Sequence, residues 1–348
     1  MNLSIAKIAL TFAGCFLGAG FLSGQEIYQF FGAYGIWGLL GIFLSVVLMC
    51  AFGILVLRLA NVCGYDSADK LIIMKENSFL RAFVSVSQIF FLVGVSVIMV
   101  AGVGSLFSQM FGISKAISAA VFCIALFFLI NGGHKRMITF FSVTVPILIV
   151  STFLLCIYVI FVFKKAMVQP EFYPTSNNAL LGTWWFSALT FVSYNIYSSV
   201  EILSPIGLLV DSKRKTIMGV AFGSLLLMIT ASSIFLSMSV YPVCSSYDLP
   251  MLFLAESVSP FLGVLYGLLI FMGMSGTALS SSVAVVHFLQ SKTKVQSKYL
   301  YSGLVCLLSY FLSLFGFSNL IGTIYPVCGY FGVGAIILMV VHFLKKSK

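Results

Sequence analysis

Long apolar runs fill most of the chain, and short segments with charged residues, glycine, proline or asparagine separate them. An α-helix needs about 20 apolar residues to cross the hydrocarbon core of a bilayer. The pattern therefore predicts an all-α membrane protein with ten transmembrane helices, which we number 1 to 10 in chain order. These helices are expected to cover residues 4–32, 34–60, 82–110, 113–131, 137–163, 179–210, 216–241, 260–289, 298–316 and 319–344.

The composition agrees with a location in the bilayer. Hydrophobic residues make up 61% of the chain and charged residues 8%, whereas a soluble domain has about 25% charged residues. The first residues hold a single lysine and no small-residue cleavage pattern, so we expect the first helix to remain in the mature protein. The eight cysteines are scattered, without a CxxC motif or a histidine at ligand spacing. We expect neither disulfides nor a transition-metal site.

The net charge of +10 is explained by topology. If the N-terminus is cytoplasmic, sixteen lysines and arginines lie in internal loops and ends, and only Lys115, Lys164 and Lys165 lie outside. We expect an integral protein of the plasma membrane, and this bias predicts that both termini face the cytoplasm. A nucleic-acid partner is not expected, because the basic excess is needed for orientation.

Two acids indicate an internal repeat. Glu26 and Glu201 are the only acidic residues inside predicted helices, they are 175 positions apart in a chain of 348, and each ends an SxxE motif followed by isoleucine. Five helices per half means that the second half is inserted upside down. We therefore expect one transmembrane domain with a first five-helix repeat at residues 1–165 and an inverted repeat at residues 178–348. Glu26 should lie toward the external side of the centre, and Glu201 toward the internal side.

The SxxE motif is also the sequence of a capping box, in which a serine and a glutamate begin a helix. A helix that begins within the membrane must follow a break. We therefore expect helices 1 and 6 to be interrupted at residues 17–21 and 192–197, with half-helices from Ser23 and Ser198. Glycines precede the first motif, and polar residues that can satisfy freed backbone groups precede the second. The alternative is that small residues only allow close helix packing and that the motif recurs by chance.

The segment KIALTFAGCFLGAGFLSGQEIYQFFGAYG, residues 7–35, resembles the opening of the YkvI-like membrane proteins, a family of the amino acid, polyamine and organocation superfamily. More distantly it resembles the first helix of sodium-coupled neurotransmitter-type symporters. The run TALSSS at residues 277–282 is similar to a Ser/Thr pair on helix 8 of those symporters. The resemblance implies a LeuT-like 5+5 fold, in which a bundle of helices 1, 2, 6 and 7 rocks against a scaffold of helices 3, 4, 8 and 9. It also implies a substrate held between broken helices 1 and 6.

The resemblance further implies one sodium site and no cofactor. Cys15 replaces the asparagine that binds a second sodium in the symporters, and helix 5 lacks the lysine that replaces sodium in some proton-coupled relatives. Hydroxyl groups on helix 8 that bond only to their own helix are the competing interpretation. The implied ligands are the carbonyls of Gly14, Leu17 and Thr277 and the hydroxyls of Ser280 and Ser281.

Two substrate classes fit the sequence. Free amides at the start of a half-helix favour a carboxylate, so an amino acid is the first expectation. The aromatic residues of helix 6, from Trp184 and Trp185 onward, together with the two acids favour an organic cation. The tryptophans are also typical of interfacial anchors. The two acids are equally typical of residues that only cap the half-helices. The candidate substrate-binding residues are Gly18, Ala19, Gly20, Phe21, Glu26, Ser193, Tyr194, Asn195, Tyr197 and Glu201.

The predicted function is a sodium-coupled symporter that carries a small organic solute by alternating access. A carrier of an organic cation or amine, coupled to protons or to sodium, and a receptor subunit that binds a small molecule without moving it are the alternatives. An enzyme is not expected, because no predicted helix holds a catalytic constellation of histidine, aspartate or cysteine. The expected partners are the solute, Na+ and the lipid bilayer.

Overall fold

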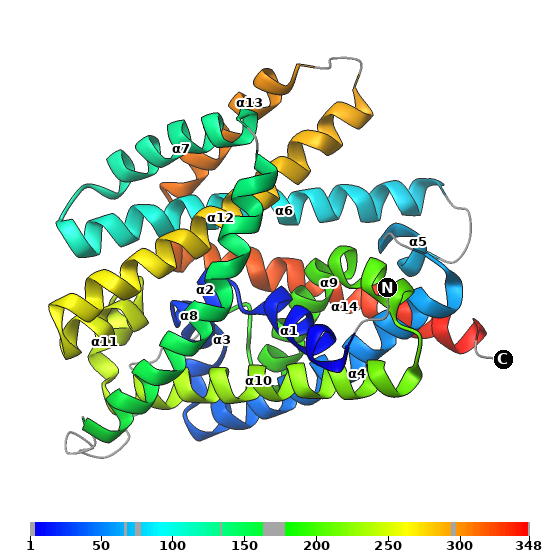
Figure 1. Ribbon diagram of the computed structural model, residues 1–348, viewed down its shortest axis with the longest axis horizontal. Coiled ribbons are helices and arrows are strands. Elements are labelled where there is room, and N and C mark those ends of the chain that lie inside the picture. The colour runs from blue at the N-terminus through cyan, green and yellow to red at the C-terminus, as the bar shows by residue number, and fades with distance from the viewer. Residues whose placement is uncertain are drawn as a thin grey trace.

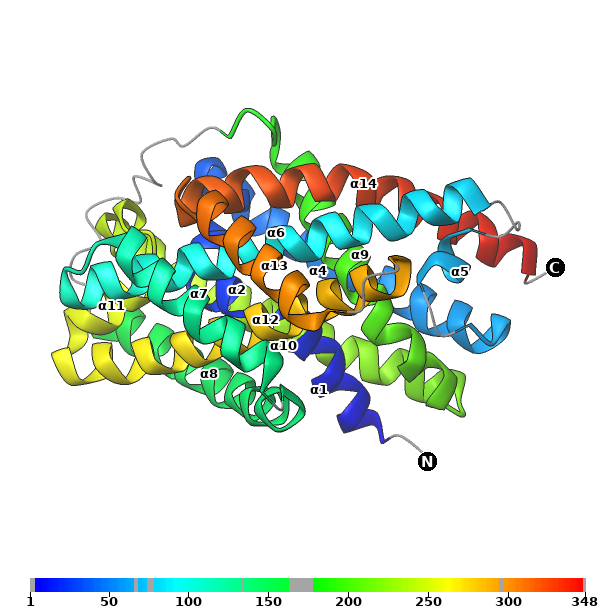
Figure 2. The same ribbon diagram turned by 90° about the horizontal axis from the view of Figure 1, so that it is seen from above.

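The computed structural model describes residues 4–65, 68–73, 78–132, 134–162, 178–293 and 297–346, and all regular structure in these ranges is helical. Most of the long helices run lengthwise, the helix at residues 134–162 crosses them steeply, and both termini lie toward the same end of the molecule (Figures 1 and 2). Every predicted apolar segment overlaps a helix. Among the described residues, five helices are long and apolar enough to cross a membrane. Lys164 and Lys165, two of the predicted external cations, lie outside the described ranges.

The first predicted helix consists of three pieces. It contains α1 (Ile5–Phe16), α2 (Ala19–Leu22) and α3 (Gln25–Phe31), followed by the short η1 (Gly32–Tyr34). The first break is at Leu17 and Gly18, where Gly18 is extended at φ −76° and ψ 171°. The second break is at Ser23 and Gly24, and Gly24 has the left-handed φ of 86° that favours glycine. The predicted interruption of helix 1 is therefore confirmed.

The remaining helices follow in the predicted order. The first half continues with α4 (Ile36–Cys63), α5 (Ala68–Ile72), α6 (Ser78–Phe111), α7 (Lys115–Asn131) and α8 (His134–Val162). The second half contains α9 (Trp184–Leu209), α10 (Lys213–Val240), η3 (Pro242–Ser246), α11 (Pro250–Val258), α12 (Pro260–Lys292), α13 (Lys298–Ser313) and α14 (Phe317–Lys346).

The predicted interruption of helix 6 is wrong, because α9 is continuous from Trp184 to Leu209. The polar side chains that were expected to satisfy a broken backbone bond to their own helix instead. Ser193 Oγ donates to the carbonyl of Leu189 at 2.7 Å, and Asn195 Nδ2 donates to that of Phe191 at 2.9 Å. These side chains therefore satisfy their polar groups on an unbroken helix.

The capping boxes are also absent. Ser198 lies inside α9, where its hydroxyl donates to the carbonyl of Asn195 at 2.8 Å. At the first motif, Gly24 rather than Ser23 is the cap of α3, and no side chain bonds to the cap. Ser23 Oγ accepts from the amide of Gln25 at 3.3 Å, so the motif forms a local turn. The Glu26 side chain therefore does not cap the start of α3.

The long helices form two groups, which lie in the lower and upper parts of Figure 1. The bundle consists of α1–α4, α9 and α10, in which α4 packs on α9 and α1 on α10. The scaffold consists of α6, α7, α12 and α13. Helix α8 contacts both groups, and α14 contacts both α9 and α6, beside which it lies in Figure 2. This is the grouping that the resemblance implies.

Helices α4 and α9 run in the same direction and define the two ends of the molecule. At the tryptophan end, Trp37 and Trp184 stack with ring centroids 5.9 Å apart. At the other end, Asn61 Nδ2 donates to the carbonyls of Gly207 at 3.1 Å and Val210 at 3.0 Å, which satisfies the end of α9. We call this the basic end because it holds Arg58, Lys70, Lys213 and Lys345.

Candidate substrate cavity

A cavity of about 610 Å³ lies where the first break of helix 1 meets α6, α9, α12 and α14. This volume suits a small organic solute. The scaffold contributes one face of α6 and the second half of α12. The bundle contributes part of α9 between Tyr194 and Ile202 together with Cys15, Phe16, Gly18, Ala19, Gly20 and Glu26. The cavity therefore lies between the two groups of helices.

The two breaks of helix 1 differ in how their backbone is satisfied. At the second break, the carbonyl of Leu22 accepts from Tyr266 Oη at 2.7 Å, and that of Ser23 accepts from the amide of Met251 at 3.0 Å. Ser23 Oγ donates to the carbonyl of Gly20 at 2.6 Å. This break is closed by protein partners, as irregular backbone within a membrane requires.

The first break is left open. Among the described residues, the structure gives no hydrogen-bond partner to the carbonyls of Gly14 and Leu17. It gives none to the amides of Ala19, Gly20 and Phe21 either. Ala19 and Gly20 line the cavity. Backbone groups in this state can bind an ion or a polar group of a solute.

Glu26 is the most buried ionisable acid of the cavity, with 5% of its surface exposed. Its Oε2 accepts a hydrogen bond from Tyr194 Oη at 2.5 Å. Its Oε1 lies against Gly20, where a Cβ atom would overlap it. The Tyr194 ring stacks on Tyr325 of α14 with centroids 4.6 Å apart. The carboxyl group is thus held by Tyr194 of α9 and lies against Gly20 of α2, and Tyr325 of α14 supports the ring of Tyr194.

An aromatic layer closes the cavity toward the tryptophan end. The ring of Phe191 lies 6.3 Å from that of Phe21, 5.2 Å from Phe30 and 5.1 Å from Phe31, centroid to centroid. All four rings are buried. Toward the basic end the lining residues are more exposed, with Ile202 at 52%. The cavity therefore opens toward the basic end.

Most of the predicted substrate residues line this cavity. Phe21 and Ser193 do not: Phe21 packs in the aromatic layer, and Ser193 faces α14, where a Cβ on Gly332 would overlap its carbonyl. Trp184 and Trp185 are outside the cavity, at the end of the molecule, as expected of interfacial anchors. The predicted residues that line the cavity are Gly18, Ala19, Gly20, Glu26, Tyr194, Asn195, Tyr197 and Glu201.

The predicted sodium ligands are only partly brought together. Thr277, Ser280 and Ser281 line the cavity, but Gly14 and Leu17 do not. The hydroxyls donate to their own helix, with Ser281 Oγ 2.8 Å and Ser280 Oγ 3.1 Å from the carbonyl of Thr277. On the other side, α1 packs chiefly against α10.

Sequence reasoning missed the face that α6 contributes. Ser85, Gln88, Leu92, Val95 and Met99 line the cavity at steps of three and four residues, which place them on one helix face. The available signal was the polar pair Ser85 and Gln88 at the start of this stripe, in a mostly apolar helix. Tyr325, which stacks on the partner of Glu26, was missed as well because nothing in its surroundings distinguishes it.

The charges of the cavity are all negative. Among its lining residues, Glu26 and Glu201 are the acids, and there is no lysine, arginine or histidine. In the part of the chain that the structure describes, no group of three histidines, cysteines, aspartates or glutamates is placed to hold a metal ion. The cavity therefore suits a cationic or zwitterionic solute better than an anion.

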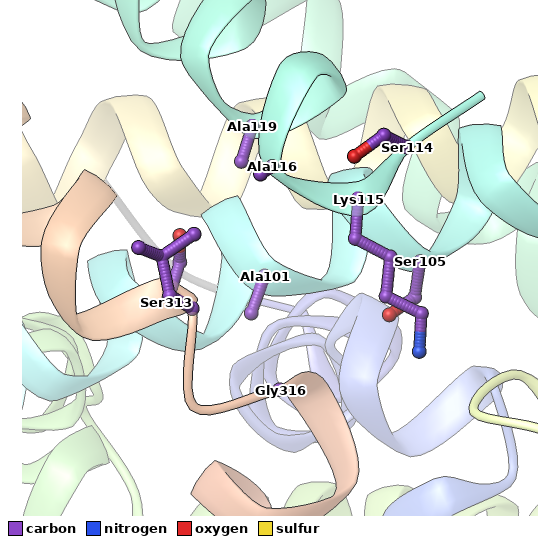
Figure 3. Close-up of a pocket in the computed structure, with 9 residues that line it drawn as sticks. Ala101, Ser105, Ser114, Lys115, Ala116, Ala119, Ser313 and Gly316 are labelled. Atoms are coloured by element: carbon purple, nitrogen blue, oxygen red, sulfur yellow. The ribbon is translucent and has the colours of Figure 1, made fainter.

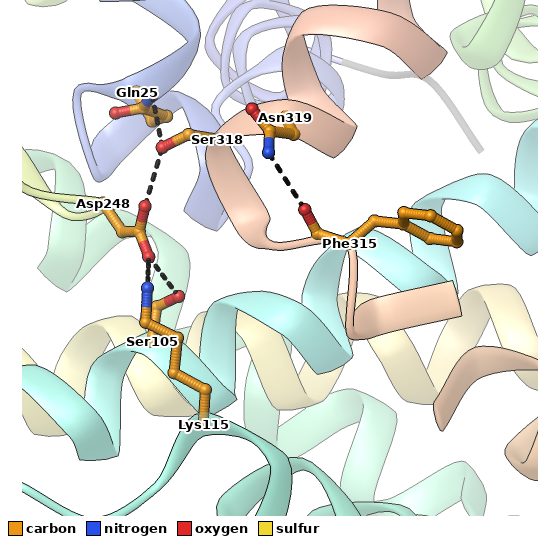
Figure 4. Close-up of polar contacts among 7 residues, drawn as sticks. All are labelled: Gln25, Ser105, Lys115, Asp248, Phe315, Ser318 and Asn319. Atoms are coloured by element: carbon orange, nitrogen blue, oxygen red, sulfur yellow. Dashed lines mark hydrogen bonds and ion pairs between the residues drawn. The ribbon is translucent and has the colours of Figure 1, made fainter. Parts of the chain in front are cut away.

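A second cavity of about 370 Å³ lies at the tryptophan end, between α6, α7 and α13 (Figure 3). Beside it, Asp248 joins the scaffold to the bundle (Figure 4). Its Oδ2 accepts from Lys115 Nζ at 2.5 Å and from Ser105 Oγ at 2.7 Å, and its Oδ1 accepts from Ser318 Oγ at 2.8 Å. Ser318 in turn accepts from Gln25 Nε2 of α3 at 2.9 Å.

No family model matches the chain. The chain is 27% identical to the uncharacterized membrane protein YkvI of Bacillus subtilis over an alignment of 334 positions that covers 94% of this chain and 92% of YkvI. It is 25% identical to the uncharacterized protein YyaD of the same organism over an alignment of 350 positions that covers 98% of each chain.

Solved structures share the fold. A substrate-bound, outward-open Na+-coupled sialic acid symporter matches with a TM-score of 0.65 at 12% identity, over 98% of this chain and 79% of the symporter. A mutant manganese transporter of Eremococcus coleocola matches with a TM-score of 0.63 at 14% identity, over 97% of this chain and 78% of the transporter. The likeness to YkvI that the opening residues indicate therefore extends along nearly the whole chain, and the fold is the LeuT-like fold of these transporters.

Proposed function

We propose that this protein is a sodium-coupled secondary transporter that moves a small organic solute, most simply an amino acid, by alternating access. One observation carries the proposal. The cavity lies between bundle and scaffold at the unsatisfied break of helix 1, is closed at one end by an aromatic layer and is open at the other. An alternating-access carrier that is open to one side of the membrane and closed to the other has this geometry.

The orientation follows from charge. In the proposed topology the ten helices span the membrane as two inverted repeats, and the basic end is cytoplasmic because lysine and arginine favour that side. The structure then represents an inward-open state. Glu26 lies beyond the first break on the external side of the cavity, and Glu201 lies on the cytoplasmic side.

The substrate class follows from the polar groups of the cavity. The amides of Ala19 and Gly20 can bind a carboxylate at the start of α2. The carboxyl group of Glu26 and the rings beside it can bind an ammonium group. An amino acid carries both. The absence of basic residues from the lining favours an amine without a carboxylate as the second candidate.

Sodium provides the driving force in this proposal. Thr277 and Ser281 on the scaffold and the open carbonyls of Gly14 and Leu17 on the bundle are oxygen ligands of the kind that alkali cations bind. Bringing α1 against α12 would complete the site, so sodium would favour the outward-facing state and raise its affinity for the solute. The Na+-coupled sialic acid symporter with the same fold supports this assignment.

A ligand screen followed by flux measurement tests the proposal. Purified protein would be heated with each of the common amino acids and with a set of primary amines, in sodium and in potassium chloride. We expect at least one compound to raise the unfolding temperature, and more so in sodium. That compound should exchange across proteoliposome membranes in a counterflow assay. Saturable binding without counterflow would contradict transport and favour a receptor subunit.

A further inference from the structure

We propose that Glu26 binds in turn the ammonium group of the solute and a proton, so that import of the solute is accompanied by export of a proton. This inference rests on the proposed function, because it assigns the carrier's return step to a residue of the same cavity. It concerns coupling rather than the identity of the solute.

The first step of the reasoning is that Glu26 has no permanent counter-charge. The ionisable groups that face it are Tyr194 from α9 and Tyr325 from α14, and Glu201 lies farther along the cavity wall. From the scaffold side, α6 and α12 present uncharged polar groups such as Gln88 and Ser281. No described lysine, arginine or histidine lines the cavity.

The second step is that Glu26 cannot turn away to water. A hydrogen bond from Tyr194 holds Oε2, and Gly20 leaves just enough room for Oε1. The rings of Phe30 and Phe191 flank Tyr194 with centroid distances of 5.5 and 5.6 Å. When the cavity closes, the carboxyl group therefore remains inside it, away from bulk water.

The third step is that a carboxylate in a closed membrane cavity must be neutralised by a cation or a proton. With solute bound, the ammonium group neutralises it. When the solute leaves to the cytoplasm, a proton from cytoplasmic water forms an O–H bond with Oε1. The empty carrier closes with neutral Glu26, and the proton returns to external water when the next ammonium group binds. One positive charge is exchanged for another at the same atom.

Glu201 does not share this constraint. It lies at the open, basic end of the cavity and is exposed. Water can stabilise its charge when the solute is absent, so no proton is required there.

A proton-release measurement tests the inference without knowledge of the natural solute. Protein in nanodiscs would be placed in weakly buffered solution at neutral pH with an indicator dye, and methylammonium chloride would be added as the probe. We expect wild type to release about one proton per chain as the cation replaces it. Glu26→Gln, which keeps an oxygen for the bond from Tyr194, should release none. Gly20→Ala should release less, because the added Cβ displaces the carboxyl group.

The matched control is Glu256→Gln, the same substitution at a partly exposed acid of α11 outside the cavity, which should behave like wild type. Equal release from wild type and Glu26→Gln would overturn the inference. Release by sodium chloride alone would also overturn it, because Glu26 would then bind sodium. Failure of the proposed function looks different, since in that case no solute shows counterflow in any variant.

Discussion

Asp248 should act as a latch that holds the tryptophan end closed. It lies in the connection between η3 and α11 and accepts hydrogen bonds from Ser105 of α6, Lys115 of α7 and Ser318 of α14. Through Ser318 it reaches Gln25 of α3. These contacts join bundle and scaffold on the side that is closed in this state. Replacing Asp248 by asparagine should therefore favour opening of the tryptophan end.

The size of the effect can be worked from the contacts. Asparagine keeps one oxygen for Ser318 but places a donor group where Oδ2 accepts from Ser105 and Lys115. A hydrogen bond to a charged group contributes about 1.5–3 kcal/mol. The ion pair adds only about 0–1 kcal/mol, because the side chain of Lys115 is 56% exposed. A loss of about 2 kcal/mol shifts the equilibrium about thirtyfold toward the outward-open state.

The same latch should respond to acid. Partial burial raises the pKa of Asp248. Hydrogen bonds from Lys115, Ser105 and Ser318, together with the charge of Lys115, lower the pKa by a larger amount, so it lies below its ordinary value. The contribution of a carboxylate with a lowered pKa is complete above the ordinary value of about 3.9 and is lost as the pH falls through the lowered one. Strong external acid should then mimic Asp248→Asn in wild type and leave the variant unchanged.

Labelling of Cys15 provides the assay, because this partly exposed thiol lines the cavity. A membrane-impermeant maleimide would be added outside sealed vesicles, and the labelled peptide quantified by mass spectrometry. Asp248→Asn should increase external labelling of Cys15. Asp211→Asn, at an exposed acid paired with Lys215, is the matched control and should not. External labelling that is equal in the two variants would refute the latch.

Three further predictions follow from the packing and from the proposed sodium site. Gly332→Ala places a Cβ on the carbonyl of Ser193 and should lower the free energy of unfolding by about 1–3 kcal/mol, whereas Gly334→Ala, where a Cβ meets nothing within 4 Å, should be neutral in the same thermal unfolding assay. Asn61→Ala removes the donor to both carbonyls and leaves that of Val210 unpaired, should cost about 1–3 kcal/mol, and should speed amide exchange in the last turn of α9; unchanged exchange would contradict the cap. Ser281→Ala should raise the sodium concentration for half-maximal uptake without reducing expression, and an unchanged sodium response would argue against the site.

The helices were predictable because each apolar run must be long enough to cross the bilayer and satisfies its backbone internally. The break at Leu17 and Gly18 was predictable because glycines interrupt the apolar run there, whereas the second break at Gly24, with its left-handed φ of 86°, lies inside the motif that was expected to start a helix. The predicted break in helix 6 failed because Ser193 and Asn195 can bond either to a neighbouring segment or to their own helix. Sequence alone does not decide between these, and the structure shows the second.

The site was predictable where residues lie near a break and not where they lie on a regular helix. Glu26 was found because an acid within an apolar run is rare, but its partner was misread: the carboxyl group bonds to Tyr194 rather than to the start of α3. The α6 stripe and the latch residue Asp248 depend on which helices pack together. Such neighbours are set by tertiary structure: the polar pair Ser85 and Gln88 marks a face of α6 without showing what it packs against, and no local pattern marks Asp248.

The most direct test of the central claim is concentrative uptake by the purified protein in proteoliposomes, with the solute identified by the ligand screen. An inward sodium gradient should accumulate the labelled solute above its external concentration, and dissipating the gradient should release it. Glu26→Gln should abolish accumulation while folding normally. If no amino acid or amine crosses the membrane under a sodium gradient, a proton gradient or solute exchange, the protein is not the carrier proposed here.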